Sequence, residues 1–305
     1  MSNETETTEI VNDDVHEEEV HVVAETEHSE TETTEGHGEV SHEVTLFAEP
    51  VFHVGSFPIT NSLINSWLAV IIVVLFAFAL KKRITRIPKG IQNAFEIIVE
   101  GALNLADSVT GDRKKSQKVF PIVFAIFIFV LINNWLGLIP GIGSIGFIEE
   151  GHGASVFVPF LRGGTADLNT TLALALFAVI GSNVFGVLMV GAWKYFNKFI
   201  NIKAITEIPK KIKKDPAIVF VNPIKAFVGL IEIIGEAAKV ASLSFRLFGN
   251  VFAGEVLLSS MAVIFAFVLP IPFMFLEVIV GIIQAVIFAM LTLVYFTIAS
   301  SEEEH

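Results

Sequence analysis

Long apolar segments dominate the chain after residue 43 and constrain its fold more than any other feature. Residues 64–80 are almost uninterrupted apolar sequence, and Lys81, Lys82 and Arg83 follow them. A helix needs about 20 apolar residues to cross the hydrocarbon core of a bilayer. The hydrophobic share of the whole chain, 53%, also exceeds the roughly 45–50% of an ordinary soluble domain. The sequence therefore predicts an all-α polytopic membrane protein.

Five segments are predicted to span the membrane within a membrane domain of residues 43–301. The fourth contains about 44 residues and would measure roughly 66 Å as a helix, about twice the thickness of the hydrocarbon core. It either breaks near Gly249 and Gly254 or runs as one strongly tilted helix, which the lack of a hydrophilic turn favours. Pro270 and Pro272 separate it from the fifth segment, so the last two form a long hairpin. The expected spans are residues 60–80, 119–140, 168–193, 226–269 and 273–299.

Residues 90–107 carry a helical pattern of a different kind. Phe95, Ile98 and Ala102 belong to an apolar stripe along one side of the predicted helix. Glu96 and Glu100 belong to the polar side, so the segment is too polar to span. We expect an amphipathic helix lying at the membrane surface.

The first 50 residues contain sixteen acidic residues and no lysine or arginine. A segment dominated by Glu, Thr and His buries too little apolar surface to offset the entropy of ordering. Residues 1–42 are therefore predicted to be a disordered acidic tail. Its five histidines lack the short fixed spacing of a folded metal site, and the chain has no cysteine, so no metal or thiolate site is expected.

The distribution of Lys and Arg indicates how the chain is oriented, because basic short loops stay on the cytoplasmic side. Residues 81–118 carry nine basic residues and residues 194–214 carry seven, whereas the Gly-rich loop 141–167 carries only Arg162. With five spans, the acidic tail is predicted outside the membrane. Residues 302–305 are predicted to form a cytoplasmic tail.

Ionisable and amide side chains interrupt the last two apolar segments. The most costly is Arg246, because a central arginine disfavours insertion by about 2.5–3.5 kcal/mol and usually marks an ion pathway. Ser242, Arg246 and Asn250 lie along one helical stripe, with Glu232 within about 40° of it. The polar residues of the two segments are Glu232, Glu236, Lys239, Ser242, Ser244, Arg246, Asn250 and Glu255, then Glu277, Gln284, Thr292 and Tyr295.

An antiparallel hairpin divides these residues into two polar sectors. Glu277 comes to about the level of Glu255 in the outer half, and Gln284 comes nearer to Arg246. Glu232 and Ser242 belong to the inner half. Arginine suits a fixed divider because it keeps its proton. Two offset half-pathways with a fixed cation between them are suited to carrying protons by way of a carboxylate that moves past them.

The run Ser-Leu-Ser-Phe-Arg-Leu-Phe-Gly-Asn-Val-Phe-Ala-Gly-Glu at residues 242–255 closely resembles subunit a of F-type ATP synthase. So do Asn-Trp-Leu-Gly-Leu-Ile-Pro at residues 134–140 and Gln-Ala-Val-Ile-Phe-Ala-Met-Leu-Thr-Leu-Val-Tyr at residues 284–295. The resemblance implies a proton-translocating stator subunit of a bacterial inner membrane, beside a c-type rotor ring, b-type stalk subunits and the other synthase subunits. The residues that it marks for proton translocation are Arg246, Asn250, Glu255, Glu277, Gln284, Glu232 and Ser242.

The outer pair departs from the family pattern, which often has one carboxylate beside a histidine or small residue. This chain has Glu255 and Glu277. Two like charges that close should not both ionise, so we expect the pair to share a proton at neutral pH.

The main alternative is a self-contained, ion-coupled secondary transporter. Such proteins usually contain internal repeats and broken helices at the membrane midplane, and the two halves of this chain show no repeat. The sequence contains no phosphate-binding P-loop. We therefore expect a non-catalytic subunit with no cofactor and no nucleic-acid partner, whose ATP chemistry belongs to partner subunits.

Overall fold

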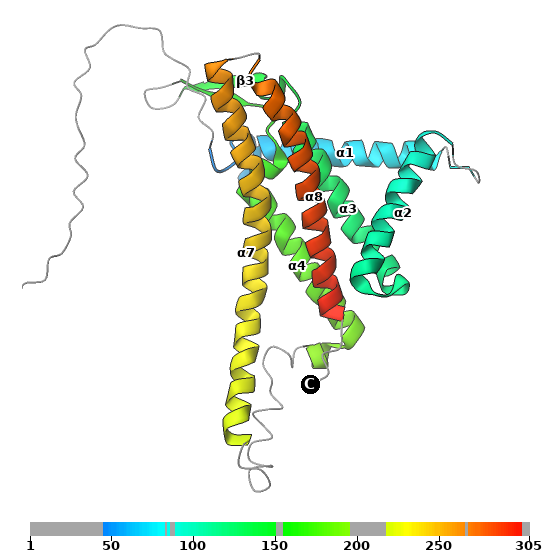
Figure 1. The fold of residues 1–305 in the computed structure, drawn as a ribbon. Coiled ribbons are helices and arrows are strands. Elements are labelled where there is room, and N and C mark those ends of the chain that lie inside the picture. The colour runs from blue at the N-terminus through cyan, green and yellow to red at the C-terminus, as the bar shows by residue number, and fades with distance from the viewer. Residues whose placement is uncertain are drawn as a thin grey trace, which may run out of the picture. The chain divides into compact units, whose positions relative to one another are not determined.

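The computed structural model describes residues 45–82, 84–85, 89–150, 155–195, 218–265 and 268–300. The predicted tails of residues 1–42 and 302–305 lie outside these ranges, as does most of the Lys-rich connector. Helices dominate the described part (Figure 1), which confirms the all-α fold class. The helices are α1 (Asn61–Lys81), α2 (Ile91–Thr110), α3 (Arg113–Gly137), α4 (Leu168–Val190), α7 (Ile218–Ile264) and α8 (Pro270–Ser300), with short 3₁₀ turns η1 (Ile142–Ser144) and η2 (Gly164–Ala166).

Five of these helices are long and apolar enough to cross a membrane: α1, α3, α4, the Phe227–Ile264 part of α7, and α8. They correspond one to one to the five predicted segments. Helix α2 is not among them, as its polar face led us to expect. Its position at the membrane surface stays a prediction.

Helix ends differ from the predicted bounds where local capping decides them. Helix α3 starts six residues earlier than expected because the Asp112 carboxylate accepts a hydrogen bond from Lys114 N at 2.9 Å and caps the first turn. Helix α4 ends at Val190, where Gly191 has a φ of 95°. Helix α8 includes both prolines, which a first helical turn tolerates.

Helix α7 is continuous through Gly249 and Gly254, so a break at these glycines is wrong and a single long helix is confirmed. In Figure 1, α1 lies across the direction followed by α7 and α8. The 21 residues of α1 are about 31 Å long, which matches the hydrocarbon core when the helix stands upright. The tilt of α7 relative to the membrane stays a prediction.

Two short antiparallel hairpins were not predicted. Strands β1 (Pro50–Val54) and β2 (Phe57–Thr60) pair just before α1. Strands β3 (Gly146–Glu150) and β4 (Ser155–Pro159) pair inside the segment that we expected to be only a Gly-rich loop. The second hairpin leads into η2, which packs against α1, α3, α4 and α7.

The core joins four helices. Helix α8 packs against α3, α4 and α7, and α4 also packs against α7. One buried cluster takes two residues from each of these helices, and Leu243 and Leu247 of α7 are each 1% exposed within it. The cluster contains Ile126, Val130, Ala175, Ala178, Leu243, Leu247, Ala285 and Phe288. This core fixes the rotation of α7 about its own axis.

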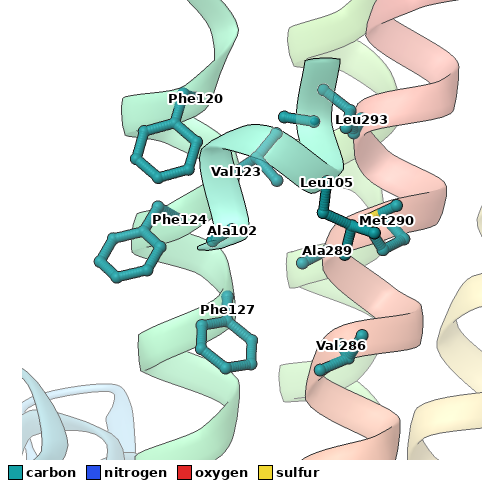
Figure 2. Close-up of a pocket in the computed structure, with 11 residues that line it drawn as sticks. Ala102, Leu105, Phe120, Val123, Phe124, Phe127, Val286, Ala289, Met290 and Leu293 are labelled. Atoms are coloured by element: carbon teal, nitrogen blue, oxygen red, sulfur yellow. The ribbon is translucent and has the colours of Figure 1, made fainter. Parts of the chain in front are cut away.

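Apolar side chains line a small cavity of about 80 Å³ between α2, α3 and α8 (Figure 2). Three phenylalanines, Phe120, Phe124 and Phe127, contribute from α3. A cavity holds water only where polar groups can bond it. This cavity has no polar lining residue and is therefore separate from any path for protons.

Candidate functional site

Arg246 lies on the side of α7 that the rest of the described chain leaves uncovered. Leu243 and Leu247, on either side of it, point into the four-helix core, so the helical turn directs Arg246 away from that core. Its Nη2 donates to Ser242 Oγ at 3.4 Å. Within the described residues, no carboxylate oxygen lies within 4.0 Å of its guanidinium.

Arg246 belongs to a continuous exposed stripe on α7, which we call the Arg246 face. Its exposed members are spaced by one to four residues: Ser242, Phe245, Arg246, Asn250 and Ala253. The structure confirms that Ser242, Arg246 and Asn250 share a side of the helix. Gln284 is half-buried on α8, and no hydrogen bond links it to Arg246 in the described part of the chain.

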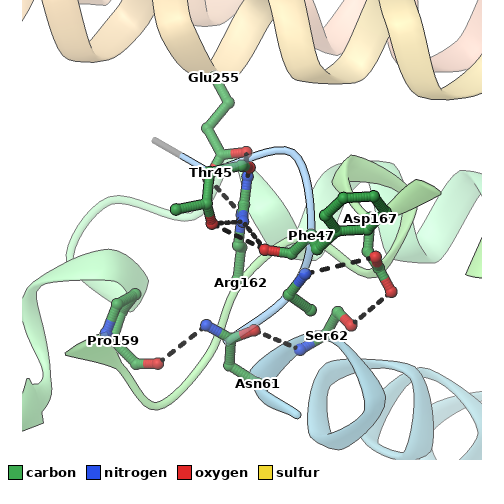
Figure 3. A network of polar contacts seen from close by, with 9 residues as sticks. Thr45, Phe47, Asn61, Ser62, Pro159, Arg162, Asp167 and Glu255 are labelled. Carbon is green, nitrogen blue, oxygen red and sulfur yellow. Dashed lines mark hydrogen bonds and ion pairs between the residues drawn. The ribbon is translucent and has the colours of Figure 1, made fainter. Parts of the chain in front are cut away.

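Glu255 of α7 forms an ion pair with Arg162, which lies between β4 and η2 (Figure 3). Arg162 Nε lies 2.9 Å from Glu255 Oε1 and 3.2 Å from Oε2, and Nη2 lies 3.0 Å from Oε2. Arg162 is 6% exposed. Bidentate guanidinium–carboxylate contacts of this kind are strong and hold both groups in a defined orientation.

The remaining donors of Arg162 bind the segment before β1. Nη1 donates to Thr45 Oγ1 and to Phe47 O, each at 3.2 Å, and Nη2 donates to Thr45 O at 2.7 Å. A guanidinium has five N–H groups, and these contacts together with those to Glu255 engage all of its nitrogens. Sequence reasoning noted Arg162 only as the single cation of its loop and missed this role.

Asp167 holds the neighbouring part of the same region. Its carboxylate caps α4 by accepting from Asn169 N at 3.2 Å. It also accepts from Ser62 Oγ of α1 at 3.1 Å and from Ala48 N at 3.4 Å (Figure 3). Asp167 thus joins the start of α4, the start of α1 and the segment next to Arg162.

Glu277 of α8 lies against the backbone of α7 at Gly254. A Cβ atom at residue 254 would lie 2.3–2.6 Å from the carboxyl atoms of Glu277, which is closer than real contacts allow. Gly254 is the residue directly before Glu255, and its lack of a side chain makes room for the half-buried Glu277. The structure thus brings Glu277 of α8 next to the part of α7 that carries Glu255.

The ion pair removes the premise of the shared-proton prediction. That prediction treated Glu255 and Glu277 as two carboxylates without a counter-charge, whereas Arg162 supplies one to Glu255. No hydrogen bond joins the two carboxyl groups among the described contacts. The sharing of a proton stays a prediction.

On the prediction that Glu277 takes part in proton translocation, replacing Gly254 by alanine should lower that transport by at least about tenfold, because a displacement of a reacting group by 1 Å can cost up to about a hundredfold. The new methyl group would push Glu277 away without removing any ionisable group. The measurement is ATP-driven acidification of inverted membrane vesicles. Gly101→Ala is the matched control, since nothing lies within 4 Å of the added Cβ in α2. Equal rates for both variants would show that the position of Glu277 is unimportant.

The inner polar residues form a network that sequence reasoning only partly anticipated. Glu236 of α7 binds Lys239 Nζ at 2.6 Å and accepts from Asn183 Nδ2 of α4 at 3.2 Å. Tyr195 donates its hydroxyl proton to Asn183 Oδ1. Asn183 thus forms a hydrogen bond between α4 and α7. Glu236 has two partners and is not free to change its position.

Tyr195 stands out because it follows α4 and was not predicted as part of the site. Burial, together with the negative charges of Glu236 and Glu232, raises the pKa of Tyr195 to about 12. The phenol therefore stays protonated at physiological pH and acts as a fixed donor. Glu232, one turn before Glu236, is half-buried.

The polar groups of α7 fall into three levels along one helix. Glu255 is nine residues from Arg246, or about 14 Å at 1.5 Å per residue. Glu232 is fourteen residues away in the other direction, or about 21 Å. Within the described residues, no group of three or more His, Cys, Asp and Glu side chains could hold a metal ion.

A sequence model of the family described as "ATP synthase A chain" matches residues 63–297. An ATP synthase subunit a from Syntrophobacter fumaroxidans is 33% identical over 246 residues, which cover 79% of this chain and 85% of that protein. The subunit from Mycobacterium bovis is also 33% identical, over 81% of this chain and 89% of the relative. The one from Moorella thermoacetica is 29% identical, over 80% and 93%. Because the match extends over all five candidate membrane helices, the chain belongs to the ATP synthase subunit a family.

Proposed function

We propose that this chain is the stator subunit that guides protons to and from a rotating c-type ring, with Arg246 as the fixed charge between two half-channels. Family membership gives its role in the membrane sector of ATP synthase and in proton transport. The observation that supports the finer mechanism is the exposure of Arg246 without a carboxylate partner in the described chain. An arginine at membrane depth needs such a partner, and a ring carboxylate would supply it.

In this mechanism the Arg246 face lies against the ring. A ring carboxylate that reaches Arg246 loses its proton to one half-channel and pairs with the guanidinium. It then accepts a proton from the other half-channel as the ring moves on. Arg246 does not take part in the exchange because its guanidinium keeps its proton. Asn250 and Gln284 would contact the ring carboxylate beside it.

The outer half-channel would use Glu255 and Glu277, and the inner one would use Glu232 and Ser242. Glu236 is the weaker candidate for a carrier, since Lys239 and Asn183 already bind its carboxylate. The two sets lie on opposite sides of Arg246 along α7, so a proton must travel on the ring to pass from one to the other.

The same proposal includes the surroundings of the chain. Its partners are a c-type ring, b-type stalk subunits, the lipid bilayer and the remaining synthase subunits. It resides in a bacterial inner membrane with its N-terminus outside and its C-terminus in the cytoplasm. The subunit itself carries out no catalysis.

Disulfide cross-linking would test the contact with the ring directly, because the chain contains no cysteine. Ala253→Cys, on the Arg246 face, should cross-link to a cysteine placed beside the ring carboxylate. The link should stop turnover, and reduction should restore it. The measurement is the shift in mobility on a denaturing gel, combined with ATP-driven proton pumping.

Phe177→Cys is the matched control for this experiment. Phe177 is 59% exposed on α4 and is not part of the Arg246 face, so its cysteine should not reach the ring. Equal cross-linking from both positions, or none from Ala253→Cys in an assembled complex, would contradict the proposed surface.

A further inference from the structure

We propose that Arg162 is a positioning residue for the outer half-channel: it holds Glu255 as the fixed, charged member of the outer pair and leaves Glu277 as the member that exchanges protons. This inference rests on the proposed function. Its basis is the bidentate contact, 2.9 to 3.2 Å long, between a cation that is 6% exposed and the Glu255 carboxylate. The arrangement is drawn in Figure 3.

The loop that carries Arg162 is itself firmly placed. A Cβ atom at Gly164 would lie 2.4 Å from Asn133 Oδ1 and 2.5 Å from Ser66 Oγ. The backbone of η2 therefore sits directly against α1 and α3. Thr165 adds a hydrogen bond to Asn134 Oδ1 at 2.6 Å. Arg162 thus extends from a rigid base, and rigidity is what allows a side chain to orient another.

The two glutamates differ in what surrounds them. Glu255 receives three contacts from Arg162. Glu277 lies against the bare backbone of Gly254, and the described contacts give it no cation. A carboxylate held by a guanidinium fork is a poor proton carrier, since protonation would break charge-assisted hydrogen bonds. Glu277 has no such bonds to lose among the described contacts.

The charged groups at Glu255 come from two neighbouring parts of the fold. Arg162 comes from the loop before η2, and Glu277 comes from α8 and lies against the neighbouring Gly254. Asp167, at the start of α4, is bound by Ser62 and Thr170 instead. Removing Arg162 would thus leave Glu255 near a second carboxylate without the counter-charge that Arg162 supplies. An uncompensated buried charge is costly, and the group neutralises by taking up a proton.

The test compares Arg162→Gln and Arg162→Lys in the assembled synthase in liposomes. The rate of proton uptake from the Glu255 side is measured at a fixed membrane potential while the pH of that side is varied. For Arg162→Gln we expect an additional inflection in the plot of rate against pH. Its rate at the acid end should be about tenfold below wild type, because Glu255 no longer holds a defined position beside the proton-exchanging Glu277. Arg162→Lys keeps the charge but cannot make the bidentate contact, so its plot should keep the wild-type shape at a lower rate.

Thr45→Val separates this role from simple anchoring of the chain. It removes the Arg162 contact with Thr45 Oγ1 and leaves the contacts with Glu255 in place, so its plot should have the wild-type shape. If Thr45→Val reproduces the Arg162→Gln plot, or if assembled Arg162→Gln retains the wild-type plot, the assignment is wrong.

If Arg162→Gln fails to assemble, the rate of proton uptake by Arg162→Lys tests the assignment. A lowered rate supports the bidentate role, and a full wild-type rate overturns it. Loss of transport in Arg246→Ala, measured alongside, reports on the proposed function separately.

Discussion

Replacing Arg246 by alanine should abolish ATP-driven proton pumping. In the proposed mechanism the ring carboxylate that reaches α7 pairs with this guanidinium, and the variant leaves that carboxylate without a counter-charge. Removing one partner of a buried ion pair costs about 3–5 kcal/mol. Since 1.36 kcal/mol corresponds to tenfold in rate, we expect a loss of about a hundredfold or more. Dye-based acidification of inverted vesicles measures it.

Two further variants serve as comparisons for Arg246→Ala. Arg246→Lys keeps a positive charge, but an ammonium can lose its proton when it is desolvated, so it should restore little pumping. Arg113→Ala is the control for the loss of an arginine: Arg113 is half-exposed at the start of α3, and its described side-chain contacts are with Asn104 and Asp107 of α2. It should pump at the wild-type rate. Full pumping by Arg246→Ala would remove the basis for a fixed central charge.

The second large effect is expected from Glu277→Gln. Glutamine has nearly the shape of glutamate and can fill the space beside Gly254, but it cannot take up or release a proton. Loss of a group that transfers protons typically costs about a hundredfold or more, and we expect at least that loss in proton uptake from the outer side. Rates of uptake into liposomes at a fixed membrane potential provide the measurement.

Glu100→Gln serves as the control for Glu277→Gln, because Glu100 is exposed on α2 and remote from α7. It should leave uptake unchanged. Gly254→Ala should resemble a weaker form of Glu277→Gln, since it displaces the same carboxyl group without neutralising it. If Glu277→Gln transported protons at the wild-type rate while Glu255→Gln did not, the two glutamates would have exchanged the roles assigned here.

Length and periodicity were sufficient to predict much of the fold. The five spanning helices follow from apolar segments of the right length, and α7 is a single helix because no hydrophilic turn interrupts it. The shared side of Ser242, Arg246 and Asn250 follows from the same helical periodicity, and all three are exposed along one stripe of α7. These features depend on residues within a few turns of one another, and helical geometry relates such residues directly.

The two β-hairpins could not be predicted from length and periodicity. Residues 146–159 read as a Gly-rich loop because their strands are only five residues each. Short strands carry little periodic signal, and pairing across a turn stabilises them more than their own composition does. The hairpin matters to the site because the chain leaves β4 directly towards Arg162.

The sequence by itself determined which residues could act: the spans, the long α7, and the polar positions Arg246, Glu255, Glu277 and Glu232. Only the tertiary structure decided how they are paired. Arg162 meets Glu255 across 93 residues, and Asn183 meets Glu236 across 53. Such contacts depend on the path of a loop and on the rotation of packed helices, and spacing along one helix specifies neither. The outer pair therefore changed from two equivalent carboxylates in the sequence to one bound by a guanidinium and one that is not.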